Sequence, residues 1–149
     1  MTQKLKTFLT TKFSEQIATS KGTNAHLKME HIVIDDVVGE HGDKEIIEKI
    51  KSKPELLPYF VATAQREVPI AGFIDGEFVS KRIDRLLLNH ETKTIVFIDY
   101  KTDINKDQFI DEYKKQLKDY EILLRSAYPE YAISGYILWL QDWTLTQIV

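Results

Sequence analysis

Two short acidic segments contain the residues of this sequence that are best suited to chemistry. The first is Arg82-Ile83-Asp84-Arg85-Leu86, and the second is Ile98-Asp99-Tyr100-Lys101-Thr102. Side chains alternate along a strand, so Asp99 and Lys101 share a face, and Asp84 can point into the same space if the segments pair. Mg²⁺ binds carboxylate oxygens and keeps several waters, while a lysine can activate a water or neutralise charge on phosphorus. The spacing therefore predicts metal-assisted hydrolysis of a phosphodiester.

The same residues also fit an ordinary structural role. Asp84 and Asp99 could lie at strand ends and form ion pairs with basic neighbours such as Arg85 and Lys101. An Asp-x-Lys tripeptide is common by itself. An acid directly after the apolar run Ile95-Val96-Phe97-Ile98 is less common, because a buried charge is costly unless it is paired or metal-bound. The two acids together favour a site over incidental ion pairs.

Hydrophobic patterning predicts the strands and the helix that would position these acids. Residues 63–88 predict a β-hairpin with its turn at Asp75-Gly76, and the run at 95–98 predicts a central strand buried on both faces. Apolar residues at helical spacing predict a helix over about 106–127. Two closing strands are expected, and they lie at 131–140 and 143–149.

The N-terminal part is expected to be helical. Apolar spacing predicts one helix over about the first twenty residues, and a second from Thr23 or Asn24 to about Asp36. Asp43 should cap a short helix, and a helical turn is expected between Pro54 and Pro58. The chain is therefore interpreted as one α/β (α+β) domain over 1–149, with a helical part, 1–60, and a catalytic sheet and helix, 61–149.

Four short motifs follow one another in the order of a known family. They are Gly22-Thr23-Asn24-Ala25-His26, the Arg-Ile-Asp strand that ends at Asp84, Asp99-Tyr100-Lys101, and Gln116-Leu117-Lys118-Asp119-Tyr120. Glu67-Val68-Pro69 adds a strand that bears a glutamate. In this order the motifs resemble RecB-like and AddA-like nuclease domains of the PD-(D/E)XK superfamily. The resemblance implies a restriction-endonuclease-like mixed central sheet flanked by helices.

The resemblance also implies a role for each motif residue. A metal ion, Mg²⁺ or Mn²⁺, would be held by one histidine, two aspartates and one main-chain carbonyl, those of His26, Asp84, Asp99 and Tyr100. The catalytic set would contain both aspartates, the catalytic lysine, two residues of the following helix and a secondary glutamate: Asp84, Asp99, Lys101, Gln116, Tyr120 and Glu67.

Several of these residues have a structural alternative. His26 lies near Met29 in the sequence and by itself would fit a hydrogen-bonded core histidine, and Glu30 at i+4 could make a helix-surface contact with it. Tyr120 lies on the apolar face of its helix and is expected to be core in part. Glu67 could be an exposed strand residue.

The predicted activity is metal-dependent hydrolysis of nucleic acid, with DNA expected, by an exonuclease or endonuclease of DNA repair or recombination. The alternative is a non-catalytic nuclease-fold module that binds DNA or a helicase partner. The sequence contains no Gly-x-x-x-x-Gly-Lys-Ser/Thr segment. The chain is thus interpreted either as a free-standing nuclease or as a module supplied with single strands by a helicase.

The amino-acid composition excludes or disfavours several further kinds of site and location. The absence of cysteine excludes disulfides, thiolate zinc sites and the iron-sulfur cluster of some relatives. A net charge of -3 disfavours phosphate binding unless basic residues gather locally. The candidates for such a basic rim are Lys51, Lys53, Lys81, Arg82, Lys114, Lys115 and Lys118. The absence of a long apolar run or a cleavable signal pattern predicts a cytoplasmic protein with no membrane association.

Overall fold

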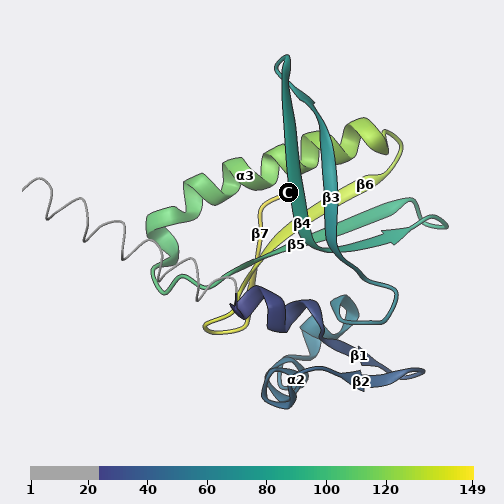
Figure 1. Cartoon of the computed structure of the whole chain (residues 1–149), viewed down its shortest axis with the longest axis vertical. Coiled ribbons are helices and arrows are strands. Elements are labelled where there is room, and N and C mark those ends of the chain that lie inside the picture. The colour runs from purple at the N-terminus through teal and green to yellow at the C-terminus, as the bar shows by residue number, and fades with distance from the viewer. Residues whose placement is uncertain (1–23) are drawn as a thin grey trace, which may run out of the picture.

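The computed structural model describes residues 24–149 and is organised around one five-stranded mixed sheet (Figure 1). Its strands lie in the order β3-β4-β5-β6-β7. Their bounds are Gln65–Ile74 for β3, Glu77–Asn89 for β4, Thr94–Lys101 for β5, Ala132–Trp139 for β6 and Thr144–Gln147 for β7. β5 and β6 are parallel, and the other neighbours are antiparallel. The central position of β5 confirms the interpretation of its apolar run.

The β3–β4 hairpin is tight and regular near its tip. A two-residue turn joins the strands, and its residues Asp75 and Gly76 have φ angles of 50° and 81°. Positive φ at both central residues is the geometry that matches the twist of a hairpin, and glycine adopts it without steric cost. Side chains then alternate along both strands, so that Val68, Ile70 and Ile83 face the core. The hairpin is confirmed as predicted.

Helix α3 (Lys106–Ala127) connects the parallel strands β5 and β6 and covers one face of the sheet. Its residues Leu117, Tyr120 and Leu124 pack on the sheet side chains of this face, including Phe97. Gly135 of β6 leaves room for the Phe97 ring, because a Cβ at this position would overlap the ring. Within residues 24–149, no helix combines the length and apolarity needed to cross a membrane.

The opposite face of the sheet packs against the N-terminal part of the described chain. Residues 24–30 are helical, and they are followed by α2 (Lys44–Lys51) and the 3-10 helix η1 (Pro54–Tyr59). The apolar core between these helices and the sheet consists of Met29, Ile32, Ile47, Ile50, Leu56, Phe60, Ile98, Tyr100 and Leu138. Asp43 caps α2 as predicted, since its Oδ1 accepts a hydrogen bond from the Ile46 N–H at 3.1 Å.

One N-terminal prediction is wrong. The helix that was expected to continue to Asp36 ends near residue 30, and the chain then forms strand β1 (Val33–Asp35), which pairs with β2 (Gly39–His41). β-Branched side chains favour this extended backbone, and the Ile34 N–H donates to the Phe60 carbonyl at 2.8 Å. Asp35 closes the turn by accepting the N–H groups of Val37 and Val38. The helix predicted over the first twenty residues lies outside the described residues.

Candidate functional site

The candidate site lies where β4 and β5 separate. Their ladder pairs Asn89 with Thr94 at one end and finishes with Arg85 opposite Ile98. One position further along, the Tyr100 N–H donates to Oδ2 of Asp84 at 2.8 Å. The Asp84 carboxylate therefore satisfies a strand N–H through its side chain, and it lies buried in the opening between the two strands.

His26 reaches Asp84 from the helix over residues 24–30. Its Nε2 lies 3.2 Å from Oδ2 of Asp84, and its ring stands edge-on to Tyr100 with 5.8 Å between ring centroids. A carboxylate beside an imidazole nitrogen orients the ring. The structure thus joins two residues that are far apart in the sequence, His26 and Asp84, in direct contact.

Arg85 fixes that helix to the strand that bears Asp84. Its side chain is completely buried, and its Nη2 donates to the carbonyls of Met29 and Ile32 at 3.1 and 3.2 Å. Its Nε donates to the Tyr100 hydroxyl at 2.6 Å, and its guanidinium lies 4.4 Å from the centre of the Phe60 ring. A cation is favourable against carbonyls at a helix C-terminus. Arg85 is therefore a positioning residue for the site.

Asp99 and Lys101 lie on the face of β5 that α3 covers. The Lys101 Nζ is 2.8 Å from Asp99 Oδ2 and donates to Gln116 Oε1 at 2.9 Å. The Gln116 Nε2 in turn donates to the Tyr120 hydroxyl at 2.8 Å, and the ammonium also lies 4.3 Å from the centre of the Tyr113 ring. The lysine is consequently held by an acid, an amide and an aromatic ring.

Keeping the Asp99 carboxylate ionised in this buried position costs free energy. Burial, followed by the charge of Asp84, raises its pKa to about 6 against the opposing effect of Lys101. Although the ammonium is close, no well-directed hydrogen bond reaches Asp99 Oδ2 from any described residue, so the contact is an ion pair rather than a good hydrogen bond. Burial and the charges of Asp99 and Asp84 also raise the pKa of Tyr120.

Glu67 belongs to the same charged region. It lies on β3 between the pairs Arg66↔Arg85 and Val68↔Ile83, and therefore level with Asp84. Its φ of 50° is unusual for a residue other than glycine and interrupts the regular alternation of β3. Burial and then the charges of Asp84 and Glu30 raise its pKa. The half-buried glutamate is thus part of the acidic site rather than an exposed strand residue.

The predicted site residues are gathered in two groups that meet at the strand opening. His26, Asp84 and Glu67 form one group, while Asp99, Lys101, Gln116 and Tyr120 form the other. Tyr100 lies between Asp99 and Lys101 in the sequence and donates its N–H to Asp84, so it joins the two groups through the main chain, and burial raises the pKa of its hydroxyl to about 12. Sequence reasoning missed the role of Arg85. Its position between the buried Ile83 and Leu86 is the signal that could have identified it.

The residue types of the candidate site suit a hard cation such as Mg²⁺, but their present arrangement does not. Among residues 24–149, no three His, Asp or Glu side chains are gathered closely enough to hold a metal ion. The contacts explain this, because Asp84 Oδ2 meets Tyr100 and His26, and Asp99 Oδ2 faces Lys101. The carboxylate oxygens of Asp84 and Asp99 are nevertheless the ligand type that Mg²⁺ and Mn²⁺ prefer, and Asp99 Oδ2 accepts no well-directed hydrogen bond from the described residues.

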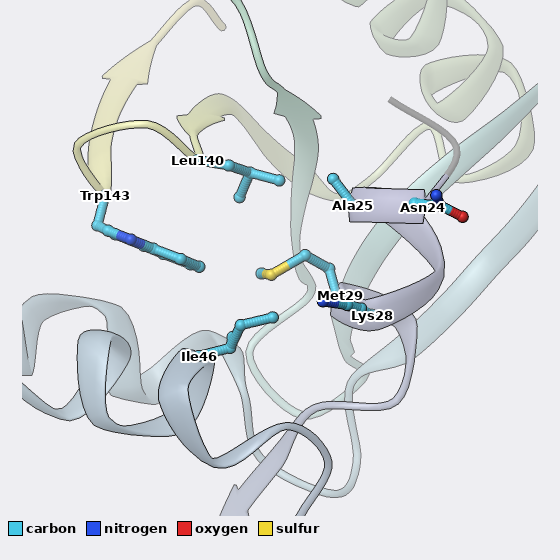
Figure 2. A pocket seen from close by; sticks show the side chains of 7 residues that line it. All are labelled: Asn24, Ala25, Lys28, Met29, Ile46, Leu140 and Trp143. Carbon is cyan, nitrogen blue, oxygen red and sulfur yellow. The ribbon is translucent and has the colours of Figure 1, made fainter. Parts of the chain in front are cut away.

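A separate apolar cavity of about 360 Å³ opens beside the N-terminal helix. Figure 2 shows the side chains of Ile46, Leu140 and Trp143 pointing toward the sulfur of Met29. Among residues 24–149, the polar residues of its lining are Asn24 and Lys28, and no acid is among them. This cavity consequently contributes no carboxylate to the candidate site.

Comparison with protein-family models gives no match for this sequence, and comparison with curated proteins gives no match either. The resemblance to RecB-like nucleases therefore depends on the motif residues themselves. We accordingly infer the function from the geometry and electrostatics of the site.

Proposed function

We propose that this protein is a metal-dependent nuclease that hydrolyses phosphodiester bonds of DNA, on a restriction-endonuclease-like sheet. The observation that carries the proposal is the meeting of Asp84, Asp99 and Lys101 where two adjacent strands separate. The order of the motifs in the sequence supports the same activity.

The charge balance of the site supports a ligand more than a set of structural ion pairs. Lys101 pairs with one carboxylate, whereas Asp84 and Glu67 add two more acids to the same region. Burial, and then the neighbouring charge of Asp84, raises the pKa of Asp99, so keeping these acids ionised side by side is costly. Such perturbed acids are concentrated at functional sites, where a bound cation offsets the repulsion.

Asp84, Asp99 and His26 would hold the metal, with the main-chain carbonyl of Tyr100 as the further ligand implied by the motif. Mg²⁺ or Mn²⁺ would supply Lewis-acid polarisation of the phosphate and a more acidic bound water. Asp99 would hold the cation through the carboxylate oxygen that now faces Lys101, and the Lys101 ammonium would lie beside the metal, where it could face the substrate.

Lys101 has the position and the support of a catalytic group. Gln116 and the Tyr113 ring also contact its ammonium, and Tyr120 in turn orients Gln116. An ammonium positioned before the substrate arrives stabilises negative charge on a phosphoryl oxygen without further reorganisation, and it can orient the attacking water. Gln116 and Tyr120 are in this view positioning residues for the lysine.

The second candidate is a nucleic-acid-binding module without catalysis. The observation in its favour is that no three possible ligands are gathered closely enough for a metal within the described chain. In this case the domain would bind DNA, alone or beside a helicase, and the acids would keep the ion pairs described above.

The test compares the parent protein with Lys101→Ala and with Lys44→Ala, which removes an exposed lysine of α2 outside the predicted basic rim as the matched control. Labelled single-stranded and duplex DNA are incubated with Mg²⁺, Mn²⁺ or chelator. Metal-dependent products from the parent and the control, with nearly complete loss in Lys101→Ala, are expected. Cleavage by Lys101→Ala at the parent rate would refute the catalytic role.

Thermal melts with Mn²⁺ separate the two candidates. A ligand that binds only the folded state raises the melting temperature by mass action. Mn²⁺ should therefore stabilise the parent and Lys101→Ala, and should stabilise Asp84→Asn and Asp99→Asn much less. DNA binding with no Mn²⁺ shift and no product would establish the binding module instead.

A further inference from the structure

Two phenylalanines stand exposed at the tip of the β3–β4 hairpin. Phe73 and Phe78 occupy directly opposite positions, and their side chains are 72% and 66% exposed. Their rings contact each other edge to face with 5.7 Å between centroids. Figure 1 shows this tip extending beyond α3 and beyond the other strands. Exposed apolar patches on a folded protein mark interaction sites, so the pair indicates a binding role.

The β3–β4 hairpin packs with one of its faces against α3 and the core. Gly72 lies against Leu123 of α3 so closely that an added Cβ would be 3.0 Å from the leucine Cδ2. Val68 and Ile70 also face the α3 side and pack on the core, whereas Phe73 and Phe78 belong to the opposite, exposed face. The aromatic pair is thus presented by a hairpin whose other face is packed on a helix.

This exposed face leads from the aromatic pair to the candidate site. Along β4, the residues on this face between Phe78 and Asp84 are Ser80 and Arg82, and both are exposed. The six-residue separation of Phe78 and Asp84 corresponds to roughly 20 Å along a strand. Across from Ser80 and Arg82 lie Ala71 and Pro69 of β3. The surface between the rings and the acid is consequently lined by small side chains and one arginine.

The charge of this surface suits a phosphate backbone. The positive charge of Arg82 acts on Glu67 at the site, so the guanidinium lies close to the acids. Arg66, which is exposed at the same end of β3, donates from Nη1 to the Glu30 carbonyl. Two guanidinium groups beside the acidic site can attract phosphates that the carboxylates alone would repel.

We propose that the exposed face of the β3–β4 hairpin binds single-stranded nucleic acid, whose bases stack on Phe73 and Phe78 while its backbone passes Arg82 toward Asp84. This inference rests on the proposed nuclease function only for the path of the nucleic acid toward Asp84. Binding of the nucleic acid to the hairpin does not require cleavage. Aromatic side chains stack on unpaired bases without regard to sequence, whereas the bases of a duplex are stacked on each other and are not accessible to the rings. The hairpin therefore selects single strands.

The test measures binding in chelator, where no metal-dependent cleavage occurs. Fluorescence anisotropy of a labelled oligothymidylate is recorded for the parent and for three pairs of substitutions at Phe73 and Phe78, to alanine, to leucine and to tyrosine. The matched control replaces Val37 and Val38, which are 91% and 52% exposed in the β1–β2 turn, by alanine. Thermal melts verify that each variant is folded, and a blunt duplex serves as the second probe.

Stacking predicts a specific order of affinities. The alanine pair and the leucine pair should bind the oligothymidylate at least about tenfold more weakly than the parent, and the tyrosine pair and the valine control should bind like the parent. Duplex binding should change much less. Unchanged affinity of the alanine pair, or full affinity of the leucine pair, would overturn the proposal. So would a parent that does not bind, or a concentration-dependent dimer that only the alanine pair abolishes.

The outcomes separate this inference from the nuclease proposal. If the parent binds through the phenylalanines but cuts no DNA with Mg²⁺ or Mn²⁺, the nuclease proposal fails and the hairpin remains a single-strand binding surface. If the parent cuts DNA and the alanine pair cuts single strands with an unchanged KM, the hairpin inference fails and the nuclease proposal stands.

Discussion

Replacing Asp99 by asparagine should stabilise the protein near neutral pH when chelator is present. Asp99 is buried between Asp84 and Lys101, and its pKa rises from the ordinary 3.8 to about 6. A carboxyl group with a raised pKa in the folded state prefers to be protonated there. Keeping it ionised at about pH 7 therefore costs folding free energy, whereas asparagine has the polarity of the protonated acid and no charge to bury.

The size of this effect follows from the two pKa values. Each unit of pKa corresponds to about 1.4 kcal/mol, so the rise from 3.8 to about 6 corresponds to about 3 kcal/mol at about pH 7. The sign follows from proton uptake: the folded state binds more protons between about pH 4 and pH 6, and the stabilising contribution of Asp99 is lost as pH rises through about 6. The advantage of the asparagine variant should thus be near zero at about pH 4 and largest at about pH 7.

Urea unfolding of both proteins in chelator, followed at several pH values, measures this difference directly. Asp111→Asn changes an exposed acid in the second turn of α3 and serves as the control, with a nearly constant difference from the parent. An Asp99→Asn protein that is less stable than the parent at about pH 7 would refute the reasoning. That result would mean that the Lys101 ion pair outweighs the burial of the carboxylate.

Three further substitutions test the support of the site. Arg85→Met should cost about 3 kcal/mol or more in urea unfolding, because buried carbonyls and a hydroxyl lose their donor, whereas Arg125→Met on the surface should cost less than about 1 kcal/mol. If the two variants lose the same free energy of unfolding, Arg85 is not a positioning residue of the site. Gly135→Ala should destabilise the protein by about 1–3 kcal/mol through overlap with Phe97, and an unchanged melting temperature would contradict this packing. Gln116→Ala should lower the cleavage rate while the Mn²⁺-induced melting shift persists; loss of the folded state would instead make Gln116 structural.

Local sequence patterns were sufficient to predict the central strand, the hairpin and α3. The continuous run Ile95–Ile98 predicted the central strand, the turn Asp75-Gly76 predicted the hairpin, and the apolar spacing over 106–127 matched the observed bounds of α3. The hairpin and α3 patterns combine a period with a terminating residue, whereas the run Ile95–Ile98 is indicated by its shortness and its β-branched residues. Long-range contacts are not required to distinguish a helix from a strand in such segments.

The segment around Ile32 and Val33 shows where local patterning is insufficient. Its apolar residues fit a helical period as well as a strand, and the outcome is decided by the hydrogen bond from Ile34 to the distant Phe60 and by pairing with β2. The role of Arg85 was hidden for the same reason. Its acceptors are main-chain carbonyls and a hydroxyl at Met29, Ile32, Tyr59 and Tyr100, which the sequence does not bring together.

The candidate site was partly accessible from residue types alone. Strand alternation was enough to place Asp99 and Lys101 together, and the structure has them in contact. The partner of Asp84 depends on where the β4–β5 ladder ends, which no periodicity indicates. The left-handed backbone at Glu67 likewise could not be predicted from the sequence, since glutamate has no preference for that conformation.

The buried guanidinium of Arg85 also makes the N-terminal helix and the acidic site one cooperative unit. If the helix over residues 24–30 detaches, His26 leaves Asp84, and the Arg85 charge simultaneously loses the Met29 and Ile32 carbonyls. Since the guanidinium would then keep only the Tyr100 hydroxyl and the Tyr59 carbonyl as acceptors, partly detached states should be scarce, and opening should occur as a single step. Amide hydrogens of this helix and of β4 should then exchange with a common free energy of opening. Any ligand that holds His26 against Asp84 would raise that energy for both segments together.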